Sequence, residues 1–338
     1  MGKFDEYIRA IGRVRQVLDA RILGQNRLKE SLILCFFSGG LTSEENSHIL
    51  LRSIPGRGKT TAGEIFASAF DLSTSKIELT IDQMPKDFFF RWELKGKGDF
   101  VRHYGKIFVN IFIVDEINRA HPDAHAAFLG AFEKGKISPP EGTFDVPFPF
   151  MVIGTYNPIE QKGTHIIPEA LKDRFRMQAG ARRLTKEEMI FLQKMHETGA
   201  FLGADQVEPL SEKEALELRA AVQNEVEVGE SIHNFVAELV AASSPEENKS
   251  LAGKTKYELS PRANIALIRT SKVVAFLDNR PFVIPADIER VAQSVLAHRI
   301  ILGDEFELSS TEDEEKERRN VVSQLVEEAI RRCAIKRQ

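Results

Sequence analysis

Residues 53–60 read Ser-Ile-Pro-Gly-Arg-Gly-Lys-Thr and follow, after Arg52, a short apolar run at 49–51. A glycine-rich loop that ends in Gly-Lys-Thr wraps backbone N–H groups around phosphates, and its lysine neutralises their charge. The threonine hydroxyl of such a loop is a ligand for Mg²⁺. The pattern therefore predicts a nucleotide site, with phosphate contacts expected from Pro55, Gly56, Arg57, Gly58, Lys59, Thr60 and Thr61.

A second motif lies about fifty residues further on, where the apolar run 111–114 ends in Asp115 and Glu116. In nucleotide hydrolases the first carboxylate holds the metal opposite the threonine, and the second polarises the attacking water. Together the two motifs predict an ATPase in which Thr60 and Asp115 bind Mg²⁺. Ser53 stands where the usual pattern has glycine, and because its Cβ restricts the backbone, the loop's geometry and affinity stay open.

The composition is that of a soluble protein with two domains. The chain has 338 residues, of which 42% are hydrophobic and 28% are charged, and its net charge of −4 provides no basic footprint for nucleic acid. Its two cysteines make no disulfide framework and fit a reducing compartment. The N-terminus lacks an apolar signal segment, and no apolar run approaches the length of a membrane span. We expect a cytoplasmic protein with no direct membrane insertion and no nucleic-acid partner.

Apolar periodicity predicts the order of the elements. Helical spacing over 4–37 is broken at Ile22–Gln25, which indicates two helices joined by a turn. Strand-like runs then alternate with helical segments, at 48–51, 75–80, 108–115, 150–156 and 176–181. This alternation predicts an α/β fold, a parallel sheet with helices on both faces, with the phosphate site at the carboxyl ends of the strands. Because helices dominate from about 184, we expect an α/β nucleotide-binding domain over 1–183 and an all-helical domain over 184–338.

Three segments do not fit the simple alternation. Residues 88–106 are typical of a hairpin-like excursion, and the proline-rich stretch 138–149 indicates a second projecting loop. The aromatic run Phe88–Phe90, with Trp92, either packs in the core or contacts a partner. The charged stretch 312–319 is interpreted as a solvated helix face.

Three further polar side chains complete a hydrolytic set. Asn157 ends the strand expected beside the Asp-Glu strand, where an asparagine can orient the attacking water or touch the γ-phosphate. Arginines that reach a γ-phosphate stabilise the transition state, and Arg174 and Arg262 are the two expected to do so. The pair His121 and His125 lacks the third ligand that a zinc site needs, so no metal is expected there.

Five runs in this order resemble the signature motifs of MoxR-type AAA+ ATPases, over about 22–299. They are Asp-Glu-Ile-Asn-Arg-Ala at 115–120, Tyr-Asn-Pro-Ile-Glu-Gln at 156–161, Pro-Glu-Ala at 168–170 with Asp-Arg-Phe at 173–175, Ser-Pro-Arg-Ala at 260–263, and Leu-Ala-His-Arg at 296–299. The resemblance makes 88–106 similar to the helix-2 insert of this clade, and the helical domain similar to an AAA+ lid.

The resemblance also implies roles for individual residues. Lys59 and Thr60 correspond to Walker A, Asp115 and Glu116 to Walker B, and Asn157 to sensor 1. Arg174 corresponds to an arginine finger that reaches a neighbouring subunit, and Arg262 to sensor 2. The segment Ile22, Leu23, Gly24 and Gln25 would line the adenine pocket. Members of the family form hexameric rings and act as chaperone-like remodelling ATPases, commonly with proteins that carry von Willebrand factor A domains. Tyr156 departs from the family, which usually has glutamine before the asparagine.

Two other functions stay open. A nucleotide-gated assembly scaffold with little hydrolysis is favoured by Ser53. A nucleic-acid motor is suggested by Lys95, Lys97 and Arg102 in the excursion, which could face a pore, although the acidic net charge opposes it.

Overall fold

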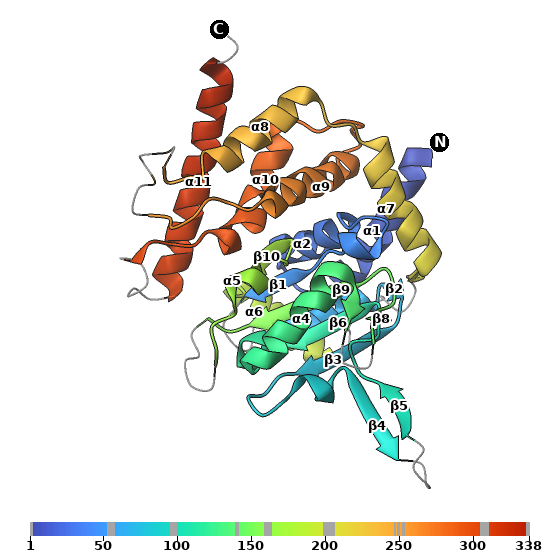
Figure 1. The fold of residues 1–338 in the computed structure, drawn as a ribbon. Coiled ribbons are helices and arrows are strands. Elements are labelled where there is room, and N and C mark those ends of the chain that lie inside the picture. Colours follow the sequence, from blue (N-terminus) through green and yellow to red (C-terminus); the bar gives the residue numbers. More distant parts are fainter. Residues whose placement is uncertain are drawn as a thin grey trace.

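The computed structural model describes residues 3–335, apart from 53–57, 95–99, 139–141, 159–163, 199–206, 247, 249–250, 252–253 and 305–310. Figure 1 shows a central sheet with helices packed around it and a group of helices above. The N-terminal helices are α1 (Lys3–Arg21) and α2 (Asn26–Phe37). Gly24 and Gln25 both have positive φ, 61° and 54°, so the predicted break between these helices is a tight left-handed turn.

Five parallel strands form the main sheet in the order β10-β1-β9-β6-β3. They are β1 (Ile49–Arg52), β3 (Thr74–Glu78), β6 (Ile111–Asp115), β9 (Met151–Tyr156) and β10 (Met177–Gly180). All five predicted strands are confirmed, although β6 begins at Ile111 where the apolar pattern predicted 108. The sheet order brings the carboxyl ends of β1, β9 and β6 side by side, which is where the predicted site residues lie.

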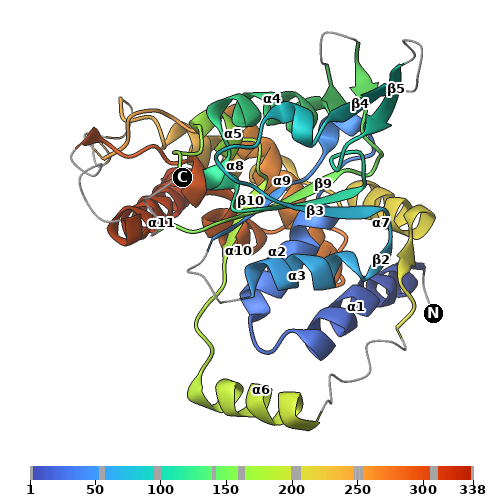
Figure 2. The same cartoon turned by 90° about the horizontal axis from the view of Figure 1, so that it is seen from below.

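Alternate residues of the strands feed two separate apolar layers, because successive side chains of a strand point to opposite faces. One layer joins the sheet to α1, α2 and α3 (Lys59–Ala67), through Ile49, Leu51, Ile113 and Ile153. The other joins it to α4 (Pro122–Lys134) and α5 (Glu169–Lys172), through Leu50, Phe112, Val114 and Val152. Figure 2 shows α4 and α5 on one side of the sheet and α1, α2 and α3 on the other.

The predicted excursion is an antiparallel hairpin of β4 (Phe90–Leu94) and β5 (Phe100–Tyr104), which projects away from the sheet (Figure 1). Its turn and the side chain of Trp92 lie outside the described residues. Phe88 is fully buried and stacks on Phe128 with 4.9 Å between ring centroids, so the aromatic run belongs to the core. The second predicted loop contains β8 (Phe144–Asp145), which pairs with β7 (Lys136–Ile137).

The C-terminal half is helical. It contains α6 (Lys186–Thr198), α7 (Glu212–Glu225), α8 (Glu230–Ala241), α9 (Pro261–Leu277), α10 (Pro285–Leu296) and α11 (Thr311–Ile335). The short elements are η1 (Ser43–Glu45), η2 (Pro85–Asp87), η3 (Ile117–Arg119), η6 (Ala297–Arg299), β2 (Phe70–Asp71) and β11 (Leu210–Ser211). Within the described ranges, no helix has both the length and the apolar character needed to cross a bilayer.

The interpretation of 312–319 as a solvated helix face is wrong for one residue. Glu315 on α11 is only 6% exposed and lies against the carboxyl ends of β1 and β10, where its carboxylate accepts a 3.3 Å hydrogen bond from Gln178 Nε2. Charged residues on an amphipathic helix are normally solvated, but this one has polar partners inside the fold that the local sequence does not reveal.

Candidate active site

The start of α3 provides the described part of the phosphate loop. Gly58 has a φ of 73°, which a residue with a Cβ rarely adopts, and it precedes the first turn of the helix. The free N–H groups of a helix N-terminus favour bound anions. Lys59 is 8% exposed, and its Nζ donates a 2.9 Å hydrogen bond to the backbone oxygen of Tyr156. The predicted contacts of Pro55, Gly56 and Arg57 lie outside the described residues, and Thr61 is exposed in the first turn of α3.

Asp115 lies beside Thr60. The Thr60 hydroxyl donates a 2.8 Å hydrogen bond to Oδ2 of Asp115, and the Thr155 hydroxyl donates to Oδ1 of the same carboxylate. A hydroxyl and a carboxylate in contact are the oxygen ligands that Mg²⁺ uses in nucleotide sites. The donor set therefore fits the predicted metal, with Thr60 and Asp115 able to bind it from α3 and β6.

Glu116 follows in a left-handed conformation, with a φ of 54°. Its backbone N–H donates a 3.1 Å hydrogen bond to the Thr155 hydroxyl, and its carboxylate pairs with Arg119 one turn later. Thr155 thus holds both acidic residues, and Arg119 holds the side chain expected to activate water. Sequence reasoning missed these two roles. The signal for Thr155 was its place on β9, two residues before Asn157, in the strand that pairs with β6.

Asn157 is 6% exposed at the end of β9, and Asn118 donates a 3.3 Å hydrogen bond to its backbone oxygen. His125 Nε2 donates a 2.8 Å hydrogen bond to the Ile117 backbone oxygen. Burial lowers the pKa of His125, so the ring is neutral and serves as a structural donor under the acidic strand. These two hydrogen bonds tie the segment that follows Glu116 to the end of β9 and to α4.

The two predicted arginines lie elsewhere. Arg174 Nη2 contacts one oxygen of Glu133 at 2.8 Å, and Arg262 Nη2 contacts the other at 2.5 Å. Arg262 also pairs with Asp173 at 3.2 Å. The hydrogen bond from Arg174 is the largest cause that lowers the pKa of Glu133, so this carboxylate is ionised between two guanidinium groups.

Glu133 is near the C-terminal end of α4, whereas Glu116 lies just before the N-terminal end of that helix. At 1.5 Å per residue the two ends are separated by roughly 17 Å. Within one chain, Arg174 and Arg262 are therefore grouped with each other and are not brought to Lys59 and Asp115.

A cleft of about 690 Å³ opens beside the phosphate loop. It is bounded by the start of α2, the carboxyl ends of β1 and β10, and helices α10 and α11. Gln25 lines it and forms two hydrogen bonds with the backbone of Arg182, at 2.7 and 2.9 Å. Gln25 is the last residue of the segment predicted for the adenine pocket, and Ile22, Leu23 and Gly24 directly precede it. The Arg182–Glu188 pair lies over Gly24.

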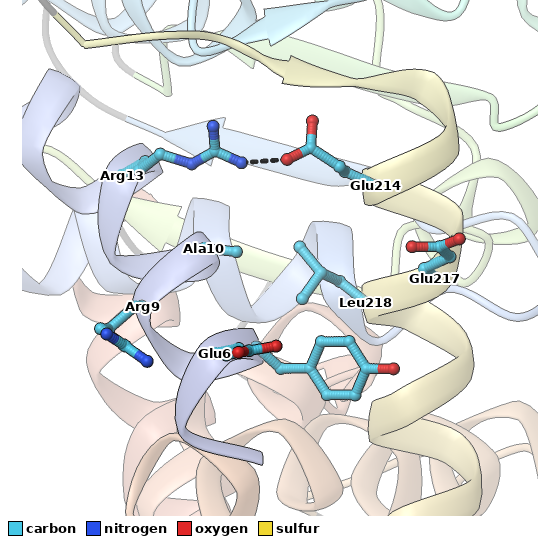
Figure 3. A pocket seen from close by; sticks show the side chains of 8 residues that line it. Glu6, Arg9, Ala10, Arg13, Glu214, Glu217 and Leu218 are labelled. Atoms are coloured by element: carbon cyan, nitrogen blue, oxygen red, sulfur yellow. Dashed lines mark hydrogen bonds and ion pairs between the residues drawn. The ribbon is translucent and has the colours of Figure 1, made fainter. Parts of the chain in front are cut away.

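A second, more open groove of about 550 Å³ lies between α1 and α7. Figure 3 shows its lining side chains, among them Arg13 and Glu214, whose charged groups face each other across the groove. None of its lining residues is a chain neighbour of the predicted site residues, whereas the cleft of about 690 Å³ is lined by Arg52, which precedes the phosphate loop, and by Pro158, which follows Asn157.

Comparisons with known proteins agree with this geometry. Residues 48–177 match the model of the ATPase family associated with various cellular activities (AAA), and 251–321 match the AAA lid domain. The chain is 31% identical to Chaperone MoxR1 of Mycobacterium tuberculosis, over 87% of this chain and 75% of that protein. It is 25% identical to Protein MoxR of Methylorubrum extorquens, over 88% of this chain and 90% of that one.

A solved structure of an inferred ATPase from Cytophaga hutchinsonii superimposes with a TM-score of 0.83 and 31% identity, covering 96% of each chain. The predicted fold class, an AAA+ parallel sheet followed by a helical lid, is confirmed. The chain belongs to the MoxR-type AAA+ ATPases.

Proposed function

We propose that this protein forms a ring, expected to be hexameric, in which ATP hydrolysis with Mg²⁺ remodels or activates a protein partner. The placement of the arginines carries this proposal. A hydrolytic AAA+ site needs a cation at the γ-phosphate, and the two predicted cations lie at the other end of α4 from the acidic pair. A neighbouring subunit supplies them if the chains associate head to tail, and such an interface forms a ring when its rotation closes.

The described residues divide the chemistry between them. Lys59 moves from the Tyr156 carbonyl to the phosphates, because a phosphate is a stronger acceptor for an ammonium than a neutral carbonyl. Thr60 and Asp115 would hold Mg²⁺, which would supply positive charge to neutralise the phosphates. Glu116 accepts the proton of the attacking water, Asn157 orients that water, and the products are ADP and inorganic phosphate.

In this proposal Arg174 and Arg262 must leave the Glu133 carboxylate and bind the triphosphate of the neighbouring chain instead. The Arg174 side chain is 16% exposed and the Arg262 side chain is 44% exposed, so both are at least partly accessible from the surface. Glu133 keeps the two guanidinium groups together until the neighbour's triphosphate replaces it. Both arginines then act on the nucleotide of the adjacent chain.

The proposed partners are proteins, in the cytoplasm, with a von Willebrand factor A domain as one candidate. One relative is named a chaperone, which supports a protein target over a nucleic acid. A nucleotide-gated scaffold with little hydrolysis is the second candidate, because Ser53 replaces a loop glycine. Phosphate release at saturating Mg-ATP separates the two functions, since a scaffold binds ATP without sustained turnover.

Glu116→Gln tests the water-activating role. The change keeps the side chain's shape and removes the proton acceptor, so we expect hydrolysis to fall at least 100-fold while ATP still binds. Glu217→Gln on α7, a residue whose side chain is 55% exposed, is the matched control and keeps full turnover. Wild-type hydrolysis by the Glu116→Gln protein would remove this residue from the mechanism.

A further inference from the structure

The C-terminal helix α11 forms one wall of the cleft beside the phosphate loop, through Glu315, Lys316 and Arg319. The cleft's opposite edge is made by the chain just outside the phosphate site. Arg52 directly precedes the loop that begins at residue 53, and Pro158 directly follows Asn157. A nucleotide whose terminal phosphates lie at Gly58–Thr60 extends its remaining part into this space.

The charge of the cleft fits an anionic ligand. Five of its lining residues are cationic and only one is acidic, although the whole chain has a net charge of −4. The cationic residues are Arg27, Arg52, Arg182, Lys316 and Arg319, and the acidic residue is Glu315. Since ligand sites typically occupy about 300–1,000 Å³, the cleft volume of 690 Å³ also fits a nucleotide's base and ribose.

Glu315 fixes the cations on both sides of the cleft. Its buried carboxylate lies 3.8 Å from Arg52 Nη1 on β1 and 3.4 Å from Arg319 Nε on its own helix. Gln178 on β10 adds hydrogen bonds of 3.3 and 3.4 Å. Arg319 lines the cleft and pairs with Glu315 through Nε, and 57% of its side chain is exposed. A planar guanidinium in this position can stack on a purine ring and donate to its ring nitrogens.

We propose that α11 reads the nucleoside end of ATP bound to the same chain, with Arg319 as the contact residue and Glu315 as the residue that positions it. This inference rests on the proposed ATP site and adds a part of the lid to it. Arg262, the lid cation expected at the nucleotide, is bound to Glu133 at the other end of α4. Of the lid residues that line the cleft on α10 and α11, the cationic ones, Lys316 and Arg319, lie on α11.

The test measures binding rather than turnover. In the Glu116→Gln background, which prevents consumption of the ligand, calorimetry gives the dissociation constants of Mg-ATP, Mg-ADP and inorganic tripolyphosphate. We expect Arg319→Ala to weaken ATP and ADP on the order of tenfold, because a charged, stacked contact is lost. Tripolyphosphate has no nucleoside, so its affinity stays within about twofold.

Arg331→Ala is the matched control. Arg331 lies on the same helix, its side chain is 69% exposed, and it pairs with Glu328 away from the cleft. We expect it to change none of the three affinities. If Arg319→Ala leaves ATP binding unchanged, or weakens tripolyphosphate as much as ATP, the nucleoside assignment is wrong. Failure of the unsubstituted protein to bind ATP would instead overturn the proposed function itself.

Discussion

Thr155 is the residue whose replacement tests the geometry of the acidic pair most sharply. Its hydroxyl donates to Asp115 Oδ1 and accepts from the Glu116 N–H at 3.1 Å, so one oxygen atom fixes both carboxylate residues. Thr155→Val keeps the shape of a fully buried side chain and removes both hydrogen bonds. A hydrogen bond to a charged group contributes about 1.5–3 kcal/mol, and a neutral one about 1 kcal/mol.

If most of the free energy of the Thr155–Asp115 hydrogen bond serves to orient the Asp115 carboxylate in the transition state, its loss lowers kcat roughly 10- to 100-fold, since about 1.4 kcal/mol corresponds to a factor of ten. Steady-state phosphate release measures this loss. Thr155→Ser retains the hydroxyl, and we expect it to recover most of the activity. Thermal unfolding reports the accompanying loss of stability.

The matched control is Thr270→Val on α9. Thr270 is also fully buried, but its hydroxyl has no hydrogen-bond partner among the residues that the structure describes. We expect this change to leave kcat unaltered and stability equal or higher, because it replaces an unpaired polar atom with a methyl group. If Thr155→Val behaves like Thr270→Val in both assays, Thr155 does not organise the site.

Two further predictions concern stability. Burial lowers the pKa of His48 to about 3, while its Nε2 donates a 2.9 Å hydrogen bond to the Phe132 oxygen. The imidazole of the unfolded chain has a pKa near 6.5, so below that pH the unfolded state binds a proton that the folded state does not. The contribution of His48 to the free energy of unfolding is therefore complete above about pH 6.5 and falls by about 1.4 kcal/mol per pH unit below it. Urea unfolding at pH 7, 6 and 5 should show a smaller pH slope for His48→Gln, and an unchanged slope would contradict this assignment. The second prediction concerns the base of the hairpin, where a Cβ on Gly105 would lie 2.2 Å from the Phe88 oxygen, so Gly105→Ala should destabilise the protein by about 1–3 kcal/mol. In the control Gly12→Ala, inside α1, the added Cβ meets nothing within 4 Å and should stabilise the protein by about 0.5–1 kcal/mol. Equal melting temperatures of the two variants would refute the packing argument.

The strands and motifs were predictable because buried parallel strands are continuous apolar runs, and because phosphate and metal ligands follow them directly in the chain. Asp115 and Thr60 meet as expected. The role of Thr155 was missed although β9 was expected beside β6, because a threonine inside an apolar strand gives no local sign of the group that its hydroxyl meets.

The same reason applies to the charged residues. Glu133 is an ordinary acidic residue near a helix end, and it becomes the shared partner of two arginines only because the fold brings Arg174 and Arg262 to it. Glu315 lies in a charged stretch that is typical of a solvated face, yet β1 and β10 bury it. Local patterns identify a charge, whereas its partner is set by segments far away in the sequence.

The central claim is that each ATP lies between two chains, one providing Lys59 and Glu116 and the other providing Arg174. Mixing Arg174→Ala protein with Glu116→Gln protein tests it directly, because each is expected to be inactive alone. With random mixing, about a quarter of the sites in a ring pair an intact Glu116 with a neighbour's intact Arg174. We predict that the mixture regains roughly that fraction of wild-type phosphate release. An Arg174→Ala protein with wild-type turnover, or a mixed ring that stays inactive, would contradict the shared site.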